Sequence, residues 1–153
     1  MRATILWATA TMAALGVGCR NEPDGALGFE LLATCLRVDQ AQERTFRTAE
    51  EWSRFVASYP GGNAGAPVDF SRSMVAARFD GAGSACVGFT VDGASIADGV
   101  TVVRATRHTS PDPCIAVLAY PQLVLAVPRA DGPVAFRIAD ARDTPPGQTP
   151  ACR

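Results

Sequence analysis

His108, Ser110 and Asp112 are the residues whose types and spacing come nearest to a reactive site. A histidine, a hydroxyl and a carboxylate are the groups of a hydrolytic triad, and alternate positions of an extended segment place them on one side. A nucleophile and its base usually come from separate elements that aim them at each other, which argues against catalysis here. We therefore expect an exposed loop over residues 108–113 and no enzyme activity, with a hydrolase built on His108 as the least favoured alternative.

Other kinds of chemistry find little support in the composition. The chain has one histidine, no closely spaced cysteine pair and no lysine for a phosphate-binding loop, so we expect no metal and no cofactor. Most aspartates lie beside Gly or Pro, as turn residues do. The formal net charge is -1 and no basic stripe is present, which excludes nucleic acid as an expected partner.

Cys19 follows an uncharged, largely apolar run, residues 3–18, that ends in small residues. The run predicts a signal peptide over residues 1–18, shorter than the roughly 20 apolar residues of a membrane-spanning helix. Its ending resembles the bacterial lipoprotein signal, in which lipid is attached to the cysteine thiol, although Gly16 stands where Leu, Val or Ile is usual. We expect a lipid-anchored envelope protein, in the outer membrane because Arg20 rather than Asp follows; the alternative is a secreted or periplasmic protein.

The chain has five cysteines, an odd number that lipidation of Cys19 would reduce to four. Four cysteines allow three connectivities, of which we favour Cys86 with Cys114 and Cys35 with Cys152. The first pair would bracket neighbouring strands, and the second would tie the C-terminal tail to the first strand. Loops of this size make each disulfide worth on the order of 3 to 5 kcal/mol.

The remaining sequence predicts one folded domain with short appendages. Residues 19–28 are polar and contain glycine, as in a flexible tether, residues 29–142 form the domain, and the Pro-rich tail covers residues 143–153. An apolar run over residues 29–38 predicts a first strand buried on both faces.

A helix is predicted over residues 48–59. Thr48 and Glu51 have the spacing of a capping box, which satisfies two backbone donors at a helix N-terminus. Trp52, Phe55, Val56 and Tyr59 recur at helical spacing and form one apolar stripe, which we expect to pack on a sheet.

After the helix, alternating apolar residues predict strands separated by turn residues such as Asp92-Gly93 and Asp98-Gly99, with Pro121 interrupting one of them. Half-buried strands of this kind need a covering layer. We expect a mostly β, α+β domain: an antiparallel sandwich or barrel-like fold of about seven strands with the one amphipathic helix. The expected strands cover residues 29–38, 44–47, 74–79, 86–91, 100–106, 115–120, 123–127 and 134–138.

The order of features over residues 48–136 resembles the C-terminal domain of the protease complex subunit PrcB family. A capped helix leads to residues 67–71 (PVDFS), a strand over residues 74–79, a Gly turn, and a strand opening on Gly88-Phe89, where the family tends to have Gly-Gly-Tyr. The resemblance implies a bacterial lipoprotein that associates with a surface or secreted protease and supports its assembly or stability.

We therefore expect a non-catalytic, protein-binding envelope lipoprotein whose loops contact a protein partner, with a secreted or surface protease as the class that the resemblance implies. The alternative from another class is a peptidase inhibitor acting through the same loops. Loops on a rigid scaffold can contact a partner without disturbing the core. The residues expected at the contact are Gly81, Gly83 and Ser84 of one loop and His108 and Asp112 of the other.

Replacing Cys19 by Ser removes the thiol to which lipid would be attached. We expect a labelled lipid precursor to enter the wild-type protein in the native bacterial envelope and not the Cys19→Ser variant. Autoradiography of the purified proteins checks this. Equal labelling of the two proteins, or none in the wild type, would contradict the anchor.

Overall fold

The computed structural model describes residues 25–111 and 118–143, which form a mostly β structure with one helix. Two four-stranded sheets, with strand orders β1-β6-β7-β10 (sheet A) and β2-β9-β4-β3 (sheet B), pack face to face, and β5 and β8 form a short ribbon. The elements are β1 (Ala26–Leu27), β2 (Glu30–Leu31), β3 (Ala41–Phe46), α1 (Ala49–Ala57), β4 (Ser73–Asp80), β5 (Gly83–Ser84), β6 (Val87–Ala97), β7 (Val100–Thr109), β8 (Leu118–Ala119), β9 (Gln122–Pro128) and β10 (Val134–Ala141).

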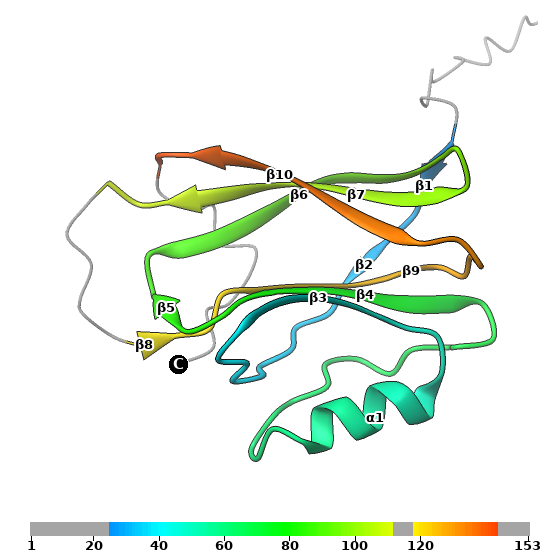
Figure 1. The fold of residues 1–153 in the computed structure, drawn as a ribbon, viewed down its shortest axis with the longest axis horizontal. Helices are drawn as coiled ribbons and strands as arrows, with labels where there is room; N and C mark the ends of the chain where they lie inside the picture. Colours follow the sequence, from blue (N-terminus) through cyan, green and yellow to red (C-terminus); the bar gives the residue numbers. More distant parts are fainter. Residues whose placement is uncertain (1–24, 112–117, 144–153) are drawn as a thin grey trace, which may run out of the picture.

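Sheet B is the middle of three layers, with sheet A on one side and α1 with its flanking loops on the other (Figure 1). Val75, Ala77 and Phe79 of β4 face the helix layer, as the alternation in the sequence predicted. Met74 and Ala76 face sheet A. The strand is therefore buried on both faces, because a helix layer covers the side that a two-layer sandwich would leave to solvent.

The hydrophobic core between the two sheets is built from apolar side chains. It takes alternate residues from four strands, and partly buried residues at the sheet edges close around it. Its buried members are Met74, Ala76, Phe89, Ala94, Val103, Ala105, Leu123, Leu125 and Val127.

Hydrogen bonds between neighbouring residues fix the start of the helix, and aromatic contacts fix its position. Thr48 is the N-cap: its hydroxyl accepts from the Glu51 backbone N–H at 3.2 Å, and the Glu51 carboxylate accepts from Thr48 N–H, which confirms the capping box. The hydrogen bond from the Arg47 backbone N–H is the main cause that lowers the pKa of Glu51. On the packed side, Phe55 lies 5.5 Å from Phe79 and 4.9 Å from Phe46 between ring centroids, so aromatic contacts fix the helix on sheet B.

The β6–β7 hairpin confirms one predicted turn and corrects another. Asp98 and Gly99 connect the strands with φ of 51° and 76°, the left-handed values of a tight hairpin turn. Asp92-Gly93, expected as a turn, instead lies inside β6, where the register shifts between Val91 and Gly93 as in a β-bulge. A bulge and a turn use the same residue types, so the dipeptide alone does not distinguish them.

The expected antiparallel arrangement is wrong for the last strand. β10 pairs with β7 in parallel over its whole length, from Val134 with Thr101 to Ala141 with His108. The chain leaves β9 in sheet B and crosses to the far edge of sheet A, where it runs in the same direction as β7. The described residues form ten strands rather than seven, because several pairings are only two residues long.

The N-terminal segment also departs from the prediction. Over residues 29–38 the strand pairing consists of β2 and one isolated bridge between Cys35 and Asn63, and the buried residues Leu32, Thr34, Leu36 and Val38 form no ladder. The Gln122 side-chain oxygen accepts from the Thr34 hydroxyl at 3.1 Å and the Leu36 N–H at 3.3 Å, replacing backbone partners. The expected tether already contains β1, which pairs with Ser95 and Ala94 of β6. Among the described residues, none of the helices has the length and apolar character needed to cross a membrane.

Candidate functional site

The first loop expected to contact a partner is partly a strand. Gly83 and Ser84 form β5 and pair with Ala119 and Leu118 of β8, at one end of the sandwich. Both are exposed, and the residue Leu118 beside them is 59% exposed. Gly81 has φ of 81°, and a Cβ there would lie 2.9 Å from the Asp39 carbonyl oxygen, so its glycine is required by the backbone.

His108 does not lie in an exposed loop, and that expectation is wrong. It is in β7, on the face of sheet A that points away from the core, and only 8% of the residue is exposed. The strand extends beyond residue 106 because β10 pairs with β7 along its full length. Asp112, the other member of the expected contact, lies outside the described residues.

The structure surrounds His108 with two partners that the sequence did not indicate. Its Nδ1 lies 2.6 Å from an Asp143 carboxylate oxygen, and its Nε2 lies 2.8 Å from the Thr90 hydroxyl. These three groups have the connectivity of a carboxylate, a base and a hydroxyl, with Thr90 and Asp143 in place of the Ser110 and Asp112 that the sequence placed nearby. Only the β6–β7 pairing and the course of the chain after β10 bring them together.

The described cysteines, Cys35 and Cys86, are both disulfide-bonded. Cys35 pairs through its backbone with Asn63, beneath the loop that follows α1, and Cys86 directly precedes β6. Cys19, Cys114 and Cys152 lie outside the described residues, so the lipidation and the pairing of cysteines stay predictions.

One open side of the described sandwich lies where β3 ends sheet B and β10 ends sheet A. Between these two edge strands lies a cavity of about 490 Å³. Among the described strands, β3 pairs only with β4 and β10 only with β7, so each has one edge without a neighbour. The cavity is lined by Ala41, Arg78, Asp80, Arg107, Phe136, Ile138 and Asp140.

An ion-pair network crosses this cavity from one sheet to the other. Asp80 of sheet B, whose side chain is 12% exposed, accepts from Arg78 Nε at 3.1 Å and from Arg107 Nε of sheet A at 2.8 Å. Arg78 continues to Glu43 at 2.6 Å, and Arg107 approaches Asp140 at 3.6 Å. The two carboxylates at the ends of the network, Glu43 and Asp140, have side chains 42% and 78% exposed, while the guanidiniums are more buried.

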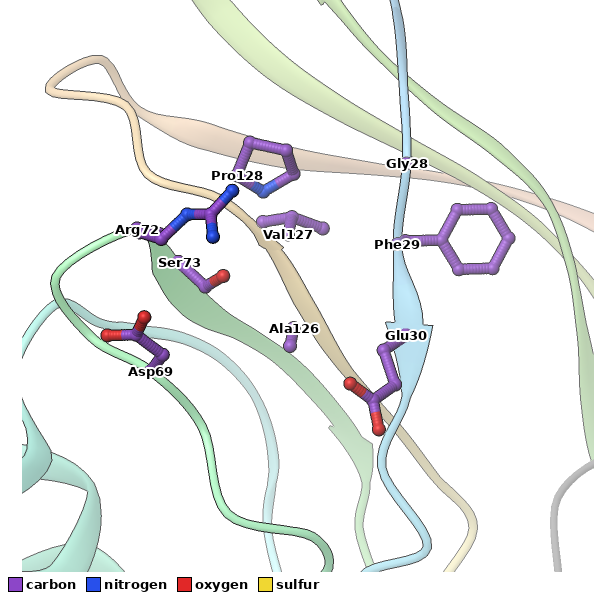
Figure 2. Close-up of a pocket in the computed structure, with 9 residues that line it drawn as sticks. All are labelled: Gly28, Phe29, Glu30, Asp69, Arg72, Ser73, Ala126, Val127 and Pro128. Atoms are coloured by element: carbon purple, nitrogen blue, oxygen red, sulfur yellow. The ribbon is translucent and has the colours of Figure 1, made fainter.

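A second cavity, of about 430 Å³, lies at the opposite side, where the chain before β2 turns away from β9. Figure 2 shows Arg72 and Asp69 on one side of it and Glu30 on the other. Hydrogen bonds from the Ser71 hydroxyl and N–H lower the pKa of Asp69. All three charged residues are exposed to solvent, and no buried polar group points into the cavity, so its geometry assigns no ligand.

No group of three or more metal-ligating side chains occurs in the described part of the chain. Comparison with protein-family models, curated proteins and solved structures found no match to this chain. The candidate sites therefore rest on the geometry of the described residues alone.

Replacing Asp80 by Asn leaves the Arg78 and Arg107 guanidiniums without their shared anion. We expect a loss of about 2 to 4 kcal/mol in the free energy of unfolding, because a largely buried charge partner is removed. Glu43→Gln is the matched control: it removes an exposed partner from the same network and should cost less than about 1 kcal/mol. Urea unfolding of the three proteins measures both, and equal losses would contradict a central role for Asp80.

Proposed function

We propose that this chain is a non-catalytic, lipid-anchored protein-binding module of the bacterial cell envelope. The observation that supports it best is the open side of the sandwich, where β3 and β10 each have an edge beside one cavity that no other described strand pairs with. A free strand edge offers unpaired backbone N–H and C=O groups, which an extended segment of another protein can pair with.

The shape of this side suits a protein segment better than a small molecule. The cavity lies between two strands, and its lining mixes the partly buried side chains of Phe136 and Ile138 with charged groups. Small-molecule sites usually enclose most of their ligand in an apolar pocket. An extended chain, by contrast, gains backbone hydrogen bonds along an edge and places alternate side chains against the lining.

The resemblance of residues 48–136 to the PrcB family suggests the class of partner, a secreted or surface protease. The contact proposed here differs from the loops expected from the sequence, because His108 is buried in β7. The exposed β5–β8 ribbon remains available at one end of the sandwich as a secondary contact. If complex formation abolishes the activity of a protease partner, the module is an inhibitor instead of a stabilising subunit.

A photoreactive residue at Ala139 of β10 tests the binding side. We expect crosslinking in the native envelope to join this position to one defined protein, because Ala139 is exposed on the proposed edge strand. Ser53 on the exposed face of α1 is the matched control and should give no such product. Mass spectrometry identifies the crosslinked protein. No product at Ala139, or the same product at Ser53, would contradict binding at the open side.

A hydrolase is the second candidate, and the contacts of His108 with Thr90 and Asp143 are the observation that favours it. In such an enzyme the Thr90 hydroxyl would attack an acyl carbon while His108 Nε2 takes the proton. The same contacts also satisfy both ring nitrogens of a largely buried histidine, which is what a structural role requires. We favour the structural role.

A fluorophosphonate, which reacts with activated hydroxyl groups, separates the two roles. We expect no adduct on Thr90, in the wild type or in His108→Ala, because the array serves the fold. The hydrolase predicts an adduct on Thr90 that His108→Ala removes. Thr106 is the internal control, because its hydroxyl donates to Asp92 at a distance of 3.0 Å instead of to His108. Labelling of both threonines would indicate a non-specific reaction. Peptide mapping locates the label.

A further inference from the structure

We propose that the partner segment adds as a strand to the free edge of β10 and places a lysine or arginine side chain between Asp140 and Glu43; this inference rests on the proposed protein-binding function. Asp140 lines the cavity between β10 and β3, and Glu43 of β3 pairs with Arg78, which lines it from the other sheet.

The charges around the cavity favour a cation. Two guanidiniums, Arg78 and Arg107, face three carboxylates, so the network carries one net negative charge. The guanidiniums are 28% and 35% exposed and both bind Asp80, whereas the Asp140 side chain is 78% exposed. The 3.6 Å approach to Arg107 is the only ion pair of the Asp140 carboxylate within the described structure. An incoming segment therefore meets the carboxylates first.

The strand geometry places a partner side chain at this point. Val134, Phe136 and Ile138 point inward from β10, and Asp140 follows them at the same spacing. A residue opposite Asp140 on an added strand would lie on the same face, with its Cβ about 5 Å away, which is the distance of a cross-strand pair. One of the two residues two positions away would face Ile138, so an apolar residue fits there.

The same charges act against unsuitable strands. Inward-pointing charged residues at a sheet edge discourage pairing with arbitrary strands. An acidic residue opposite Asp140 would be repelled, and an apolar one would take solvent from the carboxylate without pairing it. The edge thus selects for a basic residue among apolar ones instead of accepting any extended chain.

Blocked peptides of sequence Thr-Val-Thr-Xaa-Thr-Val-Thr test the proposal on the full-length protein in detergent micelles, with Xaa as Lys, Gln or Glu. We expect the Lys peptide to bind about three- to fivefold more tightly than the Gln peptide, and the Glu peptide more weakly still, as exposed ion pairs allow. The largest amide shifts in NMR spectra should fall on β10, and added salt should reduce the Lys preference.

Asp140→Asn should remove most of the Lys preference without unfolding the protein, because Asp140 is exposed. Glu50→Gln on α1 removes an equally exposed carboxylate far from β10 and should leave the preference unchanged. Equal binding of the Lys and Glu peptides, a preference that survives Asp140→Asn, or no binding of any peptide would overturn the inference. Crosslinking at Ala139 in the native envelope would still succeed in that case if the protein-binding function is right, so the two failures are distinguishable.

Discussion

The double burial of sheet B is the constraint on which the rest of the structure depends. Its central strands, β4 and β9, send alternate side chains into two different cores, one shared with sheet A and one shared with α1. A shift of one residue in their register would exchange the two sets, so both cores specify the same register. The position of the helix, the alignment of the two sheets and the open side with its cavity follow from that one pairing.

Local signals in the sequence predicted the elements whose chemistry is local. Thr48 and Glu51 indicated the helix start because a capping box is complete within four residues, and Asp98-Gly99 indicated a hairpin because left-handed φ values favour such residues. Pro121 separates β8 from β9 as expected, since proline has no N–H to donate to a strand ladder. The mostly β class with one helix was predictable because the patterns that indicate each strand and the helix lie within short segments of the sequence.

Features that depend on the order of the strands in the sheets could not be predicted from the sequence. The parallel pairing of β10 with β7 and the contacts of His108 with Thr90 and Asp143 require knowing which strands are neighbours. Residues near His108 in the sequence were therefore misleading, because its true partners come from another strand and from beyond β10. The ion pair between Asp80 and Arg107 is similar: each residue continues an ordinary strand, and only the packing of the two sheets brings them together.

The parallel placement of β10 also has a consequence for how the chain acquires its structure. The β6–β7 hairpin pairs through its own turn, whereas β10 reaches β7 only after the chain has passed through sheet B as β9. Contacts between distant parts of a chain form late, because loop closure must precede the pairing. Until β10 pairs, β7 is the edge strand of sheet A, and Arg107 on it does not yet have Asp140 as a partner. Arg107, which also pairs with Asp80 of sheet B, thus gains its second carboxylate only when the last strand joins the sheet.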